Sequence, residues 1–260
     1  MNLPKPTIRV NVDPTNPGQF FACCGLLELA DRLWGEAEGW FEGDQFLIAS
    51  DGDLAALIGE VSQVELIQID KNDATASPIG FVAPFETLRL DWWQDGMAGG
   101  RDLKVWAGSM DGFRIARAMQ NALRGVRYHS EDLLDVGQVV YDPVDGKKKE
   151  PFYFDARRCP NAHSRDVGFA PNDLQMTTTA LPAVEFFCLI GLQRCRPAKT
   201  NRPRVFRYQT WAEPLPARLA GPTVACSFAV ADSKHYQFEN WYRTGQKKHK
   251  AFRSAIEITS

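Results

Sequence analysis

The chain has 260 residues, of which 44% are hydrophobic and 24% charged, and its formal net charge is −2. This length can bury a substantial core in one large domain or two small ones. No apolar run approaches the roughly 20 residues that cross a bilayer, and the N-terminal residues lack the apolar segment of a signal peptide. The six cysteines include no C-x-x-C pair, which argues against a disulfide scaffold or a zinc site. We expect a cytoplasmic protein that contacts no membrane.

The charges are distributed unevenly along the chain. Residues 1–100 contain 5 Lys and Arg against 16 Asp and Glu, whereas residues 101–260 contain 25 against 16. This asymmetry is compatible with a basic surface that faces a polyanion and an acidic surface that faces protein or solvent. Two solvated faces of one domain would give the same counts, so both interpretations stay open.

The first hundred residues begin with a β-α-β-β pattern. Alternating apolar residues predict a strand at 7–13, and the largely apolar segment 16–34 predicts a buried helix. Asn16 occupies the N-cap position of this helix, and Pro17 occupies its first helical position. Short apolar runs between turn residues predict further elements, namely two strands within 39–49, a helix at 53–61, and strands at 64–70 and 86–93.

The segment 109–127 predicts an amphipathic helix whose polar face carries arginines. Arg114, Arg117 and Arg124 recur at helical spacing and are called here the arginine stripe, and Arg127 follows shortly after them. Like charges in register repel one another unless anions meet them. Guanidinium groups match phosphate oxygens well, so RNA or DNA is an apt partner for the stripe. Acidic residues from elsewhere in the fold could serve equally.

The later half contains three further basic segments. Residues 151–179 show little periodicity and are typical of an ordered loop that makes contacts. After a second largely apolar helix that begins at Pro182, residues 194–207 contain six Lys and Arg and no acid, and their prolines favour an exposed loop that leads into a strand. Residues 240–253 interleave cations with aromatic residues, an arrangement that suits a single-stranded polynucleotide, although core packing is the commoner fate of such aromatics.

These elements predict an α+β fold, with a mixed or antiparallel sheet packed by two apolar helices and with long basic loops. We expect a single domain over residues 1–260, with a possible soft boundary at the glycine-rich stretch near 95–101. The start of the first helix is a possible phosphate contact through Asn16, Gly18 and Gln19, because N–H groups at a helix start can bind phosphate. The candidate nucleic-acid contacts are the cations of the basic segments, namely Lys104, Arg114, Arg117, Arg124, Arg127, Arg157, Arg158, Arg165, Arg202, Arg204, Arg207, Arg243, Lys247, Lys248 and Lys250. No metal or cofactor is expected.

Three stretches of the chain, taken in order, resemble a known family. They are NVDPTNPGQFFACCGLLELADRLW near the start, LRLDWW with LKVWAGSMDGFRIARAM in the middle, and FDARRCPNAHSRDVGFAPNDLQMTTTALPAVEFFCLIGLQR later. They resemble the Csb-three family of CRISPR-associated proteins, a Cas-eight-like, large-subunit-like component of type I-U (I-G) systems. The resemblance implies a non-enzymatic subunit of a Cascade-type surveillance complex in antiviral defence, with crRNA, target DNA and other CRISPR-associated effector subunits as partners. It assigns no catalytic residue.

Other functions remain possible from the sequence. His249 lies amid lysines in QKKHK, so an RNA endonuclease that uses His249 is one alternative. A purely protein-binding scaffold is another. Cys23 and Cys24 are poor nucleophile candidates, because a thiol in an apolar helix stays protonated. Three aspartates could hold the metal of a nuclease, although no spacing places them on one face, namely Asp155, Asp166 and Asp173.

Overall fold

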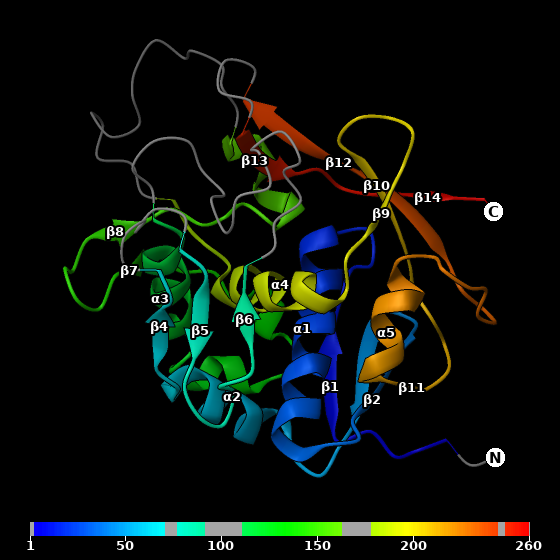
Figure 1. The fold of residues 1–260 in the computed structure, drawn as a ribbon, viewed down its shortest axis with the longest axis horizontal. Coiled ribbons are helices and arrows are strands. Elements are labelled where there is room, and N and C mark those ends of the chain that lie inside the picture. The colour runs from blue at the N-terminus through cyan, green and yellow to red at the C-terminus, as the bar shows by residue number, and fades with distance from the viewer. Residues whose placement is uncertain (1–2, 71–76, 92–110, 163–177, 244–247, 260) are drawn as a thin grey trace.

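The computed structural model describes residues 3–70, 77–91, 111–162, 178–243 and 248–259, and Figure 1 shows its ribbon. Helices and antiparallel sheets are both present, which confirms the predicted α+β class. The buried hydrophobic residues form one cluster to which the central helices and the three larger sheets contribute. None of the helices in the described ranges combines the length and apolar character that a bilayer-spanning segment needs. The possible boundary near 95–101 lies outside the described residues.

The helical elements alternate with short strands along the chain. The α-helices are α1 (Pro17–Trp34), α2 (Leu54–Gln63), α3 (Gly112–Ala122), α4 (Pro182–Arg194) and α5 (Ala217–Val224). Shorter 3₁₀ segments are η2 (Val126–His129), η3 (Leu133–Asp135) and η4 (Ala156–Ala162).

Within the described ranges, the strands pair antiparallel in four sheets. The first sheet has the order β1-β3-β2-β11, with bounds Ile8–Asn11, Gln45–Ala49, Glu38–Glu42 and Leu215–Pro216. The second has the order β13-β12-β10-β9, with bounds Lys248–Phe252, His235–Arg243, Val205–Gln209 and Ala198–Lys199, and β14 (Ile256–Ile258) pairs with the start of β12. The third has the order β4-β5-β6, with bounds Leu66–Gln68, Ile79–Phe81 and Arg89–Leu90. Strands β7 (Val140–Tyr141) and β8 (Lys148–Lys149) form a hairpin.

The two apolar helices predicted from the sequence, α1 and α4, lie together at the centre of the molecule (Figure 1). Their backbones touch at two glycines. A Cβ atom on Gly25 would lie 2.1 Å from the carbonyl oxygen of Phe187, and one on Gly191 would lie 2.0 Å from that of Phe21. Side chains at these positions would push the helices apart, so glycine sets the spacing of the core.

The second sheet packs one face against the start of α1. The Tyr208 ring of β10 lies 4.3 Å from the Phe20 ring of α1, and the Phe238 ring of β12 lies 6.2 Å from that of Phe21. Side chains alternate between the two faces of a strand, so the intervening residues face away from the core. The cross-strand register places these outward residues opposite one another in two pairs, Val205 with Glu239 and Arg207 with Gln237.

The sequence predicts the early elements well and several later ones poorly. The predicted strand at 7–13, the helix at 16–34, the pair of strands within 39–49 and the helix at 53–61 match β1, α1, β2 with β3, and α2 at nearby bounds. Of the strand predicted at 86–93, the described residues 86–91 contain β6, and residues 92 and 93 lie outside the described part of the chain. Strands β5, β9 and β11 and helix α5 have no counterpart among the predictions.

Candidate nucleic-acid interface

Two residues of the arginine stripe, Arg114 and Arg117 on α3, meet carboxylates from the β7–β8 hairpin. Arg117 Nη2 lies 2.7 Å and 2.8 Å from the two carboxylate oxygens of Asp142, which is almost fully buried. Arg114 Nη1 lies 3.2 Å from Asp145 Oδ2, and Arg114 Nε lies 3.5 Å from Asp111 Oδ2. The alternative in which acids from elsewhere in the fold serve the stripe therefore holds for Arg114 and Arg117.

The other arginines that follow α3 have neutral partners. Arg124 is exposed, and its Nε donates at 3.2 Å to the carbonyl oxygen of Ser62, in the last turn of α2. Arg127 is exposed as well, donates to the Gln138 side chain, and lies over the Tyr128 ring at 5.5 Å. Because no carboxylate neutralises them among the described residues, Arg124 and Arg127 stay candidate phosphate contacts.

The start of α1 is covered, so the prediction that it contacts phosphate is corrected. Asn16 is 2% exposed, and its Oδ1 accepts hydrogen bonds from the N–H groups of Gly18 and Ala156, both at 3.1 Å. Gly18 lies so close to Phe154 that a Cβ atom there would be 2.4 Å from the Phe154 carbonyl oxygen. Gln19 is buried too, and its Oε1 accepts from the Asp13 N–H. The helix start therefore binds the chain's own backbone and not a ligand.

Buried acids hold the segment that covers this helix start. Asp155 is fully buried and accepts from Asn16 Nδ2 at 3.0 Å and from Arg157 Nη2 at 2.7 Å. Glu185 of α4 accepts from the N–H groups of Phe154 and Asp155 at 3.2 Å and 3.3 Å, and burial raises the pKa of Glu185 to about 8. Asp155 is thus a structural residue. No cluster of metal-ligating side chains occurs among the described residues.

Arg157 and Arg158 lie on η4 beside this segment. The exposed end of Arg157 also pairs with Asp135 and donates to the Leu134 carbonyl oxygen at 2.8 Å, so two carboxylates neutralise its charge. Arg158 is partly buried, and within the described part of the chain its buried Nε has no hydrogen-bond partner. Of these two predicted contacts, Arg158 makes fewer interactions within the fold than Arg157.

His249 lies in the interior, which removes the basis for an exposed catalytic histidine. Its Nδ1 is 2.6 Å from Asn240 Oδ1, and its Nε2 is 2.8 Å from the Phe152 carbonyl oxygen. Burial lowers the pKa of His249 to about 3, so the ring is neutral at pH 7. A neutral ring that donates to the Phe152 carbonyl from Nε2 must accept a hydrogen bond at Nδ1. Turning the Asn240 amide by half a turn places its Nδ2 donor against His249 Nδ1, and this Nδ2 otherwise lacks a hydrogen-bond partner among the described residues.

The remaining predicted residues divide into two groups. Cys23 and Cys24 are buried in α1, and burial raises the pKa of both thiols, as expected for an apolar helix. Some candidates lie outside the described residues, namely Lys104, Arg165, Asp166, Asp173 and Lys247. For three others the structure describes only the strand that contains them, which is β12 for Arg243 and β13 for Lys248 and Lys250.

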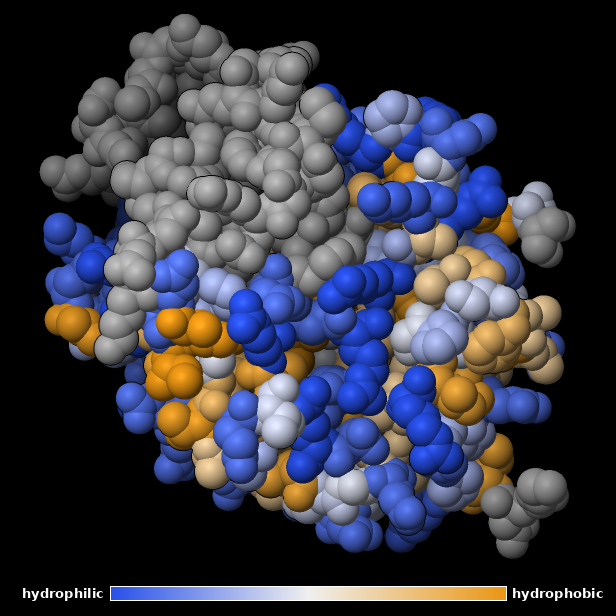
Figure 2. All heavy atoms as spheres, viewed as in Figure 1, coloured by the Kyte–Doolittle hydropathy of each residue, from blue (hydrophilic) through white to orange (hydrophobic). Residues whose placement is uncertain are grey.

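Among the predicted basic segments, the β9–β10 hairpin has the cations that carboxylates neutralise least. Lys199, Arg202 and Arg207 are exposed, and no carboxylate pairs with them among the described residues. Arg204 is partly exposed and adopts a positive φ of 66° at the end of the loop. Figure 2 shows hydrophilic residues over this corner of the molecule. The hairpin therefore presents cations that the fold itself does not neutralise.

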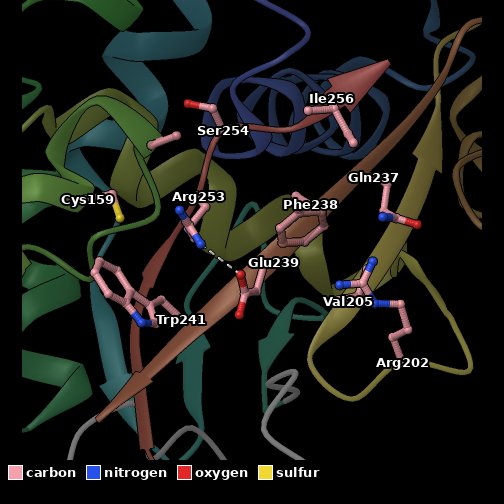
Figure 3. A pocket seen from close by; sticks show the side chains of 11 residues that line it. Cys159, Arg202, Val205, Gln237, Phe238, Glu239, Trp241, Arg253, Ser254 and Ile256 are labelled. Atoms are coloured by element: carbon pink, nitrogen blue, oxygen red, sulfur yellow. Dashed lines mark hydrogen bonds and ion pairs between the residues drawn. The ribbon is translucent and has the colours of Figure 1, made fainter. Parts of the chain in front are cut away.

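An open groove of about 590 Å³ adjoins this hairpin on the outward face of the second sheet. Figure 3 shows Arg202 on one side of the groove, and Trp241 with Arg253 on the other. Arg207 shares the strand face of Val205 and lies opposite Gln237, both of which line the groove. The full lining comprises Ala156, Cys159, Arg202, Val205, Gln237, Phe238, Glu239, Trp241, Arg253, Ser254 and Ile256.

Gln237 and Glu239 of this groove lie outside the basic segments identified from the sequence, whereas Arg253 and Trp241 belong to the segment 240–253. Arg253 Nη1 lies 3.0 Å from Glu239 Oε2, and its guanidinium lies 5.5 Å from the Trp241 ring centroid. A signal was available in HYQFENWYR, where polar residues alternate with aromatic ones from 235 to 239 and so mark the outward face of a strand. The pairing of this strand with β10 was not visible.

Comparisons with known proteins identify no relative. Neither a family model, nor a curated protein, nor a solved structure matches the chain.

Proposed function

We propose that this protein binds single-stranded nucleic acid through phosphate contacts at the β9–β10 hairpin and the adjoining groove. The observation that carries the proposal is that Arg202 and Arg207 are exposed beside one groove while no carboxylate among the described residues pairs with them. Cations that a fold neutralises contribute little to binding an anion, whereas unpaired guanidinium groups are free to take phosphate oxygens. Lys199 extends this basic edge along the same hairpin.

The resemblance to the Csb-three family supports a more specific form of the proposal. In that form the chain is a cytoplasmic, non-catalytic subunit of a Cascade-like complex, and the polyanion is crRNA or target DNA. Other effector subunits would hold it beside the guide. The buried His249 favours this interpretation over an RNA endonuclease, because a general acid or base must reach the substrate.

The salt dependence of binding tests the phosphate contacts. We would measure the affinity of the purified chain for a short labelled single-stranded RNA by fluorescence anisotropy, from low to physiological ionic strength. The logarithm of affinity should fall linearly with the logarithm of salt concentration, by about 0.7 for each phosphate contact on a single strand. The double variant R202Q/R207Q should bind more weakly and lose about 0.7 of slope per arginine.

The matched control is Arg114→Gln, which removes an exposed arginine that is already paired with Asp145 and Asp111. Its slope should stay that of the wild-type chain. An affinity that does not change with salt would contradict the phosphate account. A loss of slope in R114Q but not in R202Q/R207Q would place the contacts on α3 instead. Failure of the wild-type chain to bind RNA or DNA would favour the protein-binding scaffold.

A further inference from the structure

The groove beside the hairpin contains an aromatic ring and a carboxylate as well as cations, and phosphate binding needs neither of them. Trp241 is partly exposed on β12, and Arg253 lies over its ring at 5.5 Å. Nucleobases stack on aromatic side chains that border a basic groove, whatever their sequence, because every base has a π-face. Trp241 is therefore placed to receive a base from a strand whose phosphates lie on Arg202 and Arg207.

Glu239 stands between the cations on the two sides of the groove (Figure 3). Its side chain is 44% exposed, and Oε2 is held by Arg253 Nη1 at 3.0 Å. Within the described residues Oε1 has no hydrogen-bond partner. A carboxylate repels phosphate and accepts hydrogen bonds only, so in a groove that binds a polynucleotide it suits a donor on a base edge.

We infer that the groove holds one unpaired base that carries an amino group, stacked on Trp241, with the amino group donating to Glu239 Oε1. This inference rests on the proposed nucleic-acid binding and adds a base preference to it. Arg253 acts as a positioning residue, because its ion pair fixes the carboxylate and its guanidinium supports the indole ring.

A comparison of cytosine with uracil distinguishes a hydrogen bond to Glu239 from base stacking alone. The two pyrimidines have the same size, but cytosine carries an amino donor at the position where uracil carries a carbonyl acceptor. The carboxylate of Glu239 attracts the first and repels the second. One hydrogen bond to a charged group corresponds to about a tenfold difference in affinity, in favour of oligocytidylate over oligouridylate of equal length.

The test is the ratio of the two affinities, measured by fluorescence anisotropy with labelled oligocytidylate and oligouridylate. The wild-type chain should prefer oligocytidylate about tenfold. Glu239→Gln should bring the ratio close to one and should not weaken oligouridylate binding, because the amide can rotate to donate to the uracil carbonyl. Glu42→Gln, an exposed residue of β2, matches the change in net charge and should keep the wild-type ratio. Trp241→Ala should weaken both oligomers by about tenfold or more, as loss of base stacking does.

Each outcome has one meaning. A wild-type ratio near one, or an E239Q ratio equal to that of the wild-type chain, overturns the base preference and leaves phosphate binding standing. No binding of either oligomer by the wild-type chain overturns the proposed function together with this inference. Trp241→Phe replaces Trp241→Ala if the alanine variant is unfolded by circular dichroism, because phenylalanine keeps a stacking face. Binding by W241A equal to that of the wild-type chain removes the stacking role.

Discussion

Replacing Arg117 should reveal whether an arginine of the stripe belongs to the fold. Arg117→Met keeps a long side chain but leaves the buried carboxylate of Asp142 with two weaker partners, the Val144 N–H at 3.0 Å and Lys149 Nζ at 3.9 Å. Removal of one member of a fully buried ion pair costs about 3 to 5 kcal/mol. Arg117 is 24% exposed and Lys149 compensates in part, so we expect a loss of about 2 to 3 kcal/mol.

Urea or thermal unfolding measures this loss, at roughly 2 to 4 °C of Tm for each kcal/mol in a chain of this size. The control is Arg114→Met on the same helix, where the side chain is 53% exposed and its partners lie at 3.2 Å and 3.5 Å, so little change is expected. The double variant R117M/D142N should recover part of the stability, because the unpaired buried charge is gone. If R117M is as stable as R114M, the assignment of Arg117 to the fold is refuted.

Three further perturbations test the core. Gly25→Ala should destabilise the chain by about 1 to 3 kcal/mol through overpacking between α1 and α4. Gly59→Ala, inside α2 with open space around it, should stabilise the chain by about 0.5 to 1 kcal/mol. Denaturant unfolding measures both changes, and changes of the same sign in the two variants would contradict this reasoning. The folded chain keeps the Glu185 proton up to about pH 8, whereas the unfolded chain loses it near pH 4.3. The free energy of unfolding should therefore fall as pH rises through that window, by up to about 1.4 kcal/mol per pH unit, and Glu185→Gln should flatten this dependence. Burial lowers the pKa of His249 to about 3, so the unfolded chain takes up a proton on this ring first, and the free energy of unfolding should fall as pH drops below about 6.5. His249→Gln should lose less stability at acid pH than the wild-type chain. An unchanged dependence of stability on acid pH would contradict the neutral buried ring.

The sequence predicted best the elements whose signal is local. Helices α1 and α4 are apolar around most of their circumference and begin with proline, and both of these properties belong to single segments. The covering of the α1 start could not be predicted, because Ala156 is 140 residues away from Asn16. For His249 the sequence does contain a signal for burial. In a strand, alternate residues face opposite sides, so a histidine between two lysines takes the inner position.

The pairing of arginines with acids shows that a regular basic pattern does not by itself mark a surface of unpaired cations. Arg114 and Arg117 stand on the most regular basic pattern in the chain, yet the turn that follows β7 returns two aspartates to them. Such a turn is visible in the sequence, but its position against α3 depends on tertiary packing. The stretch from 186 to 212 contains no acid at all, so its cations have no local carboxylate to meet them. Tertiary packing can still bring an acid to such a stretch, because Arg194 Nε lies 2.6 Å from Glu28 Oε2 of α1. The acid count of a segment therefore shows which cations lack a local partner, and the packing of the fold decides which of them stay unpaired.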